Sequence, residues 1–310
     1  MAFNPLQPFT RAAADAAGLT WRRLSGPRYQ RLFQGVYVSA DVPVTPLVRA
    51  RGALLAVGGD AAIYGVSAAE VRELPVPVSE DVHVLVDPDA RRVRVSGIVI
   101  HRGRRKLSEY RGIPLTMMAD TFVDVGRDHP LVDAVALGDA MVLRGFATPQ
   151  HLVRTAAAET GRGIRRARRA ASLVRSRVDS PRETRLRLLM VFNGLPEPEI
   201  AYEVTAAGRM RRLDTAYPEW RVATEYDGRH HVERDQQWSD DLERREELNH
   251  EQWRVVTVTG RQAWDPERVL ARIRRALADA GAPLPPPRQE WRRHFPVARS
   301  FAADGDPAMP

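Results

Sequence analysis

The sequence predicts a multi-domain α/β protein. The chain has 310 residues, which is long enough for two or three domains that each bury a core. Its hydrophobic share of 44% and charged share of 28% are typical of globular proteins, and segments of helical periodicity alternate with strand-like segments. We therefore predict domains at residues 1–45, 46–177 and 178–281, followed by a proline-rich tail at 282–310. We expect this tail to be extended or disordered, with Trp291 and Phe295 as residues that can dock back on the body.

The composition excludes several classes of protein. No window approaches ~18 uninterrupted apolar residues, so we expect no membrane-spanning segment. The absence of cysteine excludes disulfides, thiolate zinc sites and cysteine nucleophiles. The first residues lack a basic region followed by an apolar run, so export is not expected and a cytoplasmic location fits best.

The chain is strongly basic, with a formal net charge of +8 and a pI near 10.4. A polyanionic partner such as nucleic acid would account for this charge. Lys106 is the only lysine, however, and a general compositional shift toward arginine accounts for the charge equally well. Charge alone therefore gives only weak support for nucleic-acid binding.

Residues 9–40 are typical of a small helix-turn-helix with a wing. A threonine that can act as a cap precedes each of two short helices, and two short strands follow them. The helices cover residues 11–17 and 21–24, and the strands cover 31–33 and 36–38. Four arginines of this module either contact phosphates or form the solvated basic face of a small packing module: Arg22, Arg23, Arg28 and Arg31.

Three short motifs in the N-terminal 125 residues carry a family resemblance. They are residues 12–24, the hairpin at 31–37 and the run Ile113-Pro114-Leu115-Thr116. In these motifs the chain resembles the N-terminal part of the AbiEi-type antitoxins of type IV toxin–antitoxin systems, which bind their own operator through a winged helix. The resemblance implies DNA recognition and a toxin partner.

The sequence from residue 46 to residue 177 predicts a mixed α/β region followed by helices. We expect helices over 46–57, 67–74, 117–125 and 131–143, and strands over 82–86 and 98–101. His83 and His101 each lie on one of these strands, where a place on the sheet surface is more typical than a role as a metal ligand.

A strongly basic helix is predicted over residues 161–177. Four of its arginines share one face by helical spacing, opposite an apolar stripe. Those arginines are Arg162, Arg165, Arg166 and Arg169. The basic face is either simply solvated, or it follows a phosphate backbone, in which case Arg165 and Arg169 contact nucleic acid.

Residues 178–281 predict a sheet flanked by helices. We expect a helix from Ser180 to Gly194, strands over 199–204, 210–217 and 221–226, a helix over 237–248, a strand over 254–259 and a helix over 266–280.

Two carboxylates lie near strand ends in this region. The tight turn Pro218-Glu219-Trp220 makes the strands that carry Asp214 and Glu225 antiparallel neighbours, which brings the two carboxyl groups within reach of one ion. Such oxygen-rich sites suit Mg²⁺ or Mn²⁺. The ion would polarise a scissile phosphate and lower the pKa of a bound water, with His230 or His231 as general base.

Further motifs extend this pattern. They are Leu213-Asp214, the run Glu225-x-Asp227-Gly228-x-x-His231, Asp241-x-x-Arg244 up to Leu248, and Trp253-Arg254-Val255. Across residues 178–281 the chain resembles an uncharacterised family of very-short-patch-repair-like endonuclease domains, which have the PD-(D/E)xK restriction-endonuclease-like fold. The resemblance implies a mixed sheet flanked by helices, magnesium-dependent hydrolysis and a DNA substrate.

The resemblance also implies a role for each matching residue. Asp214 and Glu225 would be the first and second metal carboxylates, and Glu183 on the first helix would be an outer acidic residue. Asp227 takes the position of the signature lysine, which this domain lacks. His231 is then the best substitute for that lysine.

Simpler explanations stand beside three of these assignments. Ser180 and Glu183 form a capping box by their spacing, and Asp227-Gly228 is a common turn pair. Arg244, which we assign to nucleic-acid contact, alternatively pairs with Asp241 on the same helix.

The sequence thus predicts a metal-dependent DNA endonuclease guided by an N-terminal DNA-binding module. The alternative is an antitoxin-like DNA-binding regulator whose nuclease-like half is a non-catalytic scaffold. RNA stays open as a substrate because no feature reads a 2′-hydroxyl group, and the oligomeric state stays open as well.

Overall fold

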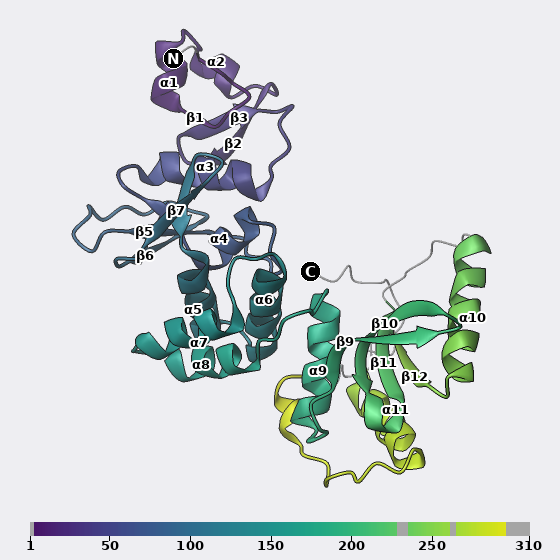
Figure 1. Ribbon diagram of the computed structural model, residues 1–310. Helices are drawn as coiled ribbons and strands as arrows, with labels where there is room; N and C mark the ends of the chain where they lie inside the picture. The colour runs from purple at the N-terminus through teal and green to yellow at the C-terminus, as the bar shows by residue number, and fades with distance from the viewer. Residues whose placement is uncertain (1–2, 228–234, 261–264, 296–310) are drawn as a thin grey trace. The chain divides into compact units, whose positions relative to one another are not determined.

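The computed structural model divides the chain into two compact units (Figure 1). It describes residues 3–227, 235–260 and 265–295, and the side chains of the helix at 235–250 from Glu243 onward. Unit 1 comprises the described residues up to His129 together with Gln150–Arg169, and unit 2 comprises Pro130–Pro149 and the described residues from Ala170 onward. Both units combine helices with sheets, which confirms the predicted α/β class.

Unit 1 begins with a small module in which two short helices accompany an antiparallel sheet of order β1-β3-β2. Its elements are β1 (Phe9–Thr10), α1 (Arg11–Ala16), α2 (Trp21–Leu24), β2 (Tyr29–Phe33) and β3 (Val36–Ser39). The Thr10 hydroxyl accepts a hydrogen bond from the Ala13 amide at 3.2 Å, so the predicted cap of the first helix is confirmed. The module closes over a core of Phe9, Ala14, Leu24 and Tyr37.

The next part of unit 1 is a mixed sheet of order β6-β5-β4-β8-β7, in which β5 and β6 are parallel. Its strands are β4 (Ala62–Ile63), β5 (Val82–Val86), β6 (Ile98–Arg102), β7 (Leu107–Tyr110) and β8 (Ile113–Thr116). The accompanying helices are α3 (Pro46–Val57), α4 (Gly65–Val71) and α5 (Met118–Asp128). The strands predicted over 82–86 and 98–101 are confirmed. The prediction lacks β4, β7 and β8, because two to four residues are too few to show a clear alternation.

One helix start differs from the prediction. The helix α4 begins at Gly65, whereas the helix predicted over 67–74 would begin with Ser67 as its cap. Ser67 is instead buried inside the helix, and its hydroxyl accepts a hydrogen bond from the His83 amide at 3.0 Å. Its polar group therefore ties the helix to the sheet rather than closing the helix end.

Helices α7 (Pro149–Ala158) and α8 (Ile164–Leu173) follow later in the chain. The prediction lacks α7 and makes α8 too long, at residues 161–177. Gly163 explains the later start of α8: it has a φ of +76°, and a Cβ added there would lie 2.6 Å from the carbonyl oxygen of Arg127. Glycine is required at this close approach, and the helix begins only after it.

Unit 2 is built on a mixed sheet of order β12-β11-β10-β9, antiparallel except for the parallel pair β11 and β12. Its strands are β9 (Glu199–Ala206), β10 (Arg209–Tyr217), β11 (Val222–Asp227) and β12 (Arg254–Thr259), with the 3-10 turn η1 (Pro218–Trp220) between β10 and β11. Its helices include α6 (Leu131–Leu143), α9 (Pro181–Phe192), α10 (Asp235–His250) and α11 (Pro266–Asp279). The helices and strands predicted over 178–281 are thus all found in their predicted order.

Helices pack on both faces of this sheet. On one face, the sulfur of Met190 in α9 accepts from the hydroxyls of Tyr217 and Thr224. On the other face, Leu248 of α10 packs in one cluster with Ala216 and Ala223. Since residues 216 and 217 are consecutive in a strand, their side chains point to opposite faces, which places α9 and α10 on opposite sides of the sheet.

A buried ion pair joins α6 to α9 in unit 2. The side chains of Arg187 and Asp139 are 1% and 2% exposed, and Nη2 of the arginine donates to a carboxylate oxygen at 3.1 Å. The same carboxylate accepts from the Thr184 hydroxyl at 2.8 Å, and Arg187 also donates to Glu197 at 3.1 Å. Most polar atoms of the pair thus have partners, as buried charges require.

The segment after α11 is ordered up to residue 295 rather than disordered, and the expected docking of Trp291 is found. Trp291 is 2% exposed, in the 3-10 turn η3 (Glu290–Arg293). The Arg288 amide donates to the carbonyl oxygen of Asn193 at 2.7 Å, which fixes the proline-rich stretch on the helix α9 end. Residues 296–310 lie outside the described part of the chain. Among the described helices, none combines the length and apolar character needed to cross a bilayer.

Candidate active site

Asp214 lies where the pairing of β10 is interrupted. Leu213 pairs with Tyr202 and Thr215 pairs with Ile200, so the residue opposite Asp214 is Ala201, which has a φ of +50° and forms no ladder pair with it. On its other side, Asp214 Oδ2 accepts a hydrogen bond from the Tyr226 amide of β11 at 2.9 Å. A side-chain oxygen thus takes the place of a backbone acceptor, and the carboxylate is fixed between two strands.

Glu225 lies beside Asp214 on the neighbouring strand. The β10–β11 ladder ends at the pair Thr215 and Thr224, and the next positions outward are Asp214 and Glu225. Residues in such cross-strand positions are direct neighbours on one face of a sheet. The predicted side-by-side arrangement of the two acids on neighbouring antiparallel strands is therefore present.

Arg244 of α10 holds the second of these acids. Its guanidinium donates to both carboxylate oxygens of Glu225, at 2.5 and 3.2 Å, and to the carbonyl oxygen of Arg212 at 2.9 Å. The Glu225 side chain is 14% exposed and that of Arg244 is 28% exposed. A partly buried two-point contact of this kind fixes both side chains. The sequence assigns Arg244 to nucleic-acid contact or to a pair with Asp241, and it does not anticipate this partner.

Glu183 forms the capping box that its spacing predicts. The Ser180 hydroxyl accepts from the Glu183 amide at 3.2 Å and donates to the Glu183 carboxylate at 2.8 Å. The other carboxylate oxygen of Glu183 accepts from the Asp179 amide at 3.0 Å. The structural role of Glu183 is thus established, and it places a third carboxylate at the start of α9.

Burial and neighbouring charges shift the pKa of all three carboxyl groups. Burial raises the pKa of Asp214, of Glu225 and of Glu183 above their usual values. The negative charge of Asp214 adds to this rise in the pKa of both glutamates, whereas the positive charge of Arg244 opposes it in Glu225 and Asp214. Asp214 is therefore the centre of a cluster of acids that a positive charge stabilises.

The donor chemistry of this cluster fits a hard divalent cation. Carboxylate oxygens are the ligands that Mg²⁺ and Mn²⁺ prefer, and Asp214 and Glu225 offer them from adjacent strands. Within the described part of the chain, no three His, Cys, Asp or Glu side chains stand close enough to hold a metal ion together. Asp227 is the last residue of β11 and pairs in register with Thr259 of β12. His230 and His231 lie outside the described residues.

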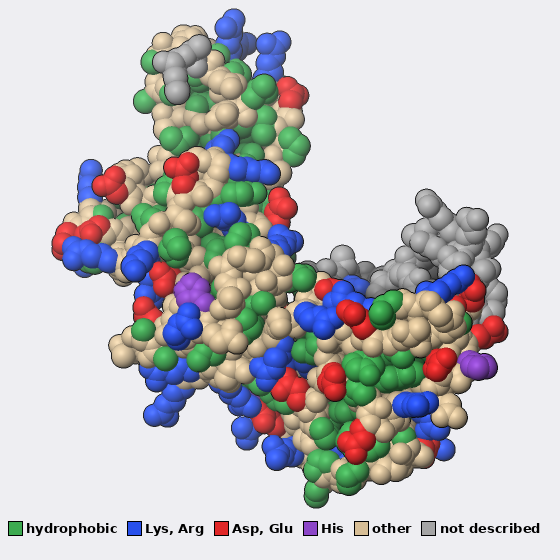
Figure 2. Space-filling view, in the orientation of Figure 1, with side chains coloured by type: hydrophobic (Ala, Val, Ile, Leu, Met, Phe, Trp, Pro, Cys, Tyr) green, Lys and Arg blue, Asp and Glu red, His purple; other side chains and the backbone are tan. Residues whose placement is uncertain are grey.

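The arginines of the N-terminal module that are predicted to contact nucleic acid are exposed. Arg22, Arg23, Arg28 and Arg31 all lie on the surface of the N-terminal module, and Figure 2 shows basic side chains projecting from it beside α2. Trp21, which the sequence does not single out, is 52% exposed next to them, with the Arg11 guanidinium 4.9 Å from its ring centroid. An exposed aromatic ring beside arginines is a feature of nucleic-acid contacts.

The basic face of α8 is divided between two roles. Arg165 and Arg169 are exposed, as predicted. Arg166 donates to the carbonyl oxygens of Arg127 and His129. Arg168 donates to three carbonyl oxygens at the end of α7 and just beyond it, those of Ala156, Ala157 and Glu159. Part of the basic character of this helix therefore serves the fold of unit 1.

A histidine pair in unit 1 is a group that the sequence treats as two separate residues. His83 Nδ1 and His101 Nε2 lie 3.0 Å apart, on the adjacent strands β5 and β6. The His101 ring also lies 4.4 Å from the ring of Tyr64, centroid to centroid. Burial lowers the pKa of His101 to about 4, with the neighbouring His83 as a second cause. The parallel register of β5 and β6, which sequence alone does not reveal, brings these side chains together.

Comparison with known proteins gives relatives without an assigned reaction. No family model matches the chain. Two proteins of Mycobacterium tuberculosis, Uncharacterized protein MT2308 of strain CDC 1551 / Oshkosh and Uncharacterized protein Rv2248 of strain ATCC 25618 / H37Rv, are each 31% identical to it over 252 residues. The aligned region covers 80% of this chain and 92% of each relative.

Proposed function

We propose that this chain, which belongs to the same family as these two mycobacterial proteins, is a metal-dependent DNA endonuclease. The observation that carries the proposal is the pair of carboxylates Asp214 and Glu225, side by side where two antiparallel strands cease to pair. Acids at such a position cost free energy unless a cation meets them. Glu183, at the start of α9, adds negative charge to the same cluster.

The arrangement of unit 2 supports this proposal. Its sheet is mixed, with order β12-β11-β10-β9, and helices cover both faces. A mixed sheet flanked by helices is what the resemblance to very-short-patch-repair-like endonuclease domains implies. The two acids also lie on the strands where that resemblance expects them, β10 and β11.

Each described residue of the site has a defined part in this proposal. Asp214 and Glu225 would hold Mg²⁺ or Mn²⁺, which when bound supplies polarisation of the scissile phosphate and a more acidic water. The Tyr226 amide orients Asp214, and Arg244 orients Glu225. His231 is proposed as general base, in place of the signature lysine that this domain lacks.

The basic surface residues would bring DNA to this site. The arginines of the N-terminal module and Arg165 and Arg169 of α8 are exposed and carry the charge that phosphates attract. We expect them to set affinity rather than sequence preference, since phosphate contacts carry no direct sequence information.

A second candidate function is favoured by the Arg244–Glu225 pair. Because Arg244 contacts both oxygens of Glu225, the second metal carboxylate already has a cationic partner within the protein. In this alternative the chain is an antitoxin-like regulator that binds operator DNA through Arg22 and Arg23, and unit 2 is a scaffold that contacts a toxin partner.

A plasmid-nicking assay in Mg²⁺, Mn²⁺ or chelator separates the endonuclease from the regulator. The endonuclease proposal expects nicking that requires the metal and is lost in Asp214→Asn and in Glu225→Gln, while DNA binding persists. Asp279→Asn is the matched control, because Asp279 pairs with Arg254 on the surface of unit 2. Nicking that survives in both site variants would contradict the proposed site. Operator binding without nicking in either metal would favour the regulator, and cleavage of a matching RNA strand would assign RNA as the substrate.

A further inference from the structure

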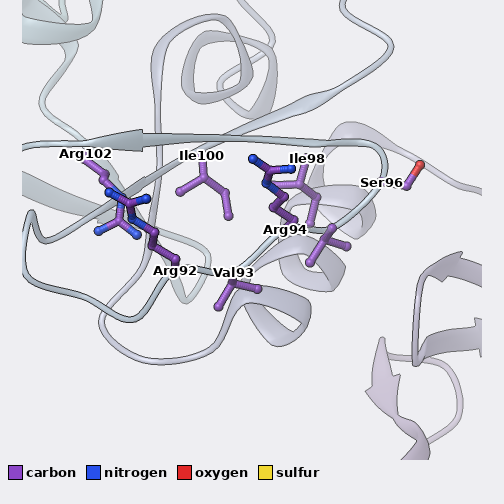
Figure 3. Close-up of a pocket in the computed structure, with 8 residues that line it drawn as sticks. Arg92, Val93, Arg94, Ser96, Ile98, Ile100 and Arg102 are labelled. Atoms are coloured by element: carbon purple, nitrogen blue, oxygen red, sulfur yellow. The ribbon is translucent and has the colours of Figure 1, made fainter.

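A hollow lies between β6 and the segment that precedes it in unit 1 (Figure 3). Its cavity volume is about 540 Å³, within the range of small-ligand sites. Residues 92–96 form one side, and alternate residues of β6 form the other. The lining consists of Arg92, Val93, Arg94, Val95, Ser96, Ile98, Ile100 and Arg102.

The floor of this hollow is apolar. Ile98 and Ile100 are two residues apart in β6, so their side chains point to the same face of the strand. His101, between Ile100 and Arg102, points to the opposite face and contacts Tyr64. Figure 3 shows Ile100 between the side chains of Arg92 and Arg94. The hollow therefore offers branched aliphatic surface between two guanidinium groups.

The preceding loop is held in place by its own contacts. Arg102 donates to the carbonyl oxygens of Pro88 and Ala90, at 3.0 and 2.9 Å, and it thereby fixes the loop over the strand. Arg104 pairs with both loop carboxylates, those of Asp87 and Asp89. Both carboxylates of this loop thus already have a cationic partner.

Arg92 and Arg94 are the free charges of the hollow. Both are exposed, and neither makes a hydrogen bond or ion pair with any residue that the structure describes. Two unpaired guanidinium groups attract an anion that can accept several hydrogen bonds, and phosphate is an anion that arginine binds in this way. A ligand that satisfies both the charges and the floor carries a phosphate next to a flat or apolar group.

We propose that this hollow binds a nucleoside phosphate, with the phosphate on Arg92 and Arg94 and the base against Ile98 and Ile100. This ligand is either a free nucleotide or an unstacked nucleotide of a single strand. Duplex DNA fits less well, because its bases are stacked inside and only phosphates and sugars would reach the aliphatic floor. The site uses none of the carboxylates of unit 2, so it stands independently of the proposed nuclease function.

The test measures binding by the full-length protein of a fluorescein-labelled short DNA single strand, with AMP, inorganic phosphate and the matching duplex as competitors. The variants are Arg92→Ala/Arg94→Ala and Ile100→Glu, which places a carboxylate in the hollow. Arg154→Ala/Arg275→Ala is the matched control, because it removes the same number of charges from exposed positions outside the hollow.

We expect the affinity for the single strand to fall about tenfold in Arg92→Ala/Arg94→Ala. The plot of log affinity against log salt concentration should become less steep by about 1.4, because each of the two lost phosphate contacts contributes about 0.7 to its slope. Ile100→Glu should cause a similar loss, and the control should keep most of the affinity. Competition by AMP identifies a free nucleotide as sufficient, and competition by longer single strands alone identifies the strand as the ligand. An equal loss in the control, unchanged binding in Ile100→Glu, or competition by phosphate or duplex as strong as by the single strand would overturn the proposal.

Discussion

Removing Arg244 tests whether the acidic pair of unit 2 is a cation site. Glu225 is 14% exposed in the natural protein, and in Arg244→Met it loses contacts at 2.5 and 3.2 Å while it stays beside Asp214. A charge-assisted hydrogen bond contributes about 1.5–3 kcal/mol when buried, and the 28% exposure of Arg244 reduces this through solvent screening. We expect a loss of about 2 kcal/mol in the free energy of unfolding of unit 2.

A double variant separates two causes of this lost stability: the lost attraction between Arg244 and Glu225, and the unpaired charge left on Glu225. In Arg244→Met/Glu225→Gln the buried charge disappears together with its partner, so at least half of the lost stability should return. Urea unfolding followed by tryptophan fluorescence measures both effects, because Trp253 is 5% exposed and packs in the core cluster of unit 2.

Magnesium then distinguishes a metal site from an internal ion pair. For a dissociation constant of about 1 mM, about 10 mM Mg²⁺ stabilises the folded state by about 1.4 kcal/mol. We expect this gain to be larger in Arg244→Met than in the natural protein, since Arg244 competes for the oxygens of Glu225. The reasoning is refuted if Arg244→Met is as stable as the natural protein without Mg²⁺, or if it gains no more from Mg²⁺ than Arg244→Met/Glu225→Gln does.

Three further outcomes follow from the structure. Arg187→Met should lose about 3–5 kcal/mol of unfolding free energy, because it leaves Asp139 buried without its cation. The double variant Arg187→Met/Asp139→Asn should recover part of this loss in urea unfolding. No recovery would contradict the view that the unpaired charge of Asp139 causes the loss. Burial raises the pKa of Asp214, so folded Asp214 keeps its proton to a higher pH than the unfolded chain does. Its contribution to stability is therefore full below about pH 3.9 and is lost as the pH rises. The stability of the natural protein minus that of Asp214→Asn, measured at several pH values, should fall as the pH rises above about 4. Burial lowers the pKa of His101 to about 4, so its neutral form stabilises the fold and that contribution is lost as the pH falls from about 6.5 toward this value; an NMR titration midpoint of His101 near the unperturbed value would contradict the burial of the pair.

The elements of unit 2 could be predicted from sequence because their local signals are strong. Ser180 and Glu183 mark the start of α9 through a capping box that the structure contains. The turn Pro218-Glu219-Trp220 sets β10 and β11 as antiparallel neighbours, and it forms the 3-10 turn η1. These features depend on residues close together in the chain, and the position of Asp214 beside Glu225 follows from them directly.

The residue pairs that the sequence did not predict depend on contacts between distant segments of the chain. Arg244 and Glu225 are separated by 19 positions, and nothing local indicates that α10 turns this arginine toward the sheet. The pair of His83 and His101 likewise requires the parallel register of β5 and β6. Arg187 did have a signal, since it lies among the leucines of α9, just as Asp139 lies within the apolar α6. Opposite charges within apolar stretches of two helices indicate a buried ion pair, although sequence alone cannot match the partners.

The interruption opposite Asp214 explains why a side chain with an acceptor oxygen occupies this strand position. Ala201 adopts a left-handed conformation, so β9 offers Asp214 no ladder partner. On the other side, the Tyr226 amide donates to the Asp214 side chain. A buried amide without an acceptor costs about 1–3 kcal/mol, so Asp214 is needed for the fold even before any cation is considered. The Tyr226 amide therefore requires an acceptor side chain at this position, whereas it does not require the negative charge of Asp214. A variant that preserves the acceptor, Asp214→Asn, should retain the fold and lose only the charge, whereas Asp214→Ala should lose both, and equal stability of the two variants would contradict this double role.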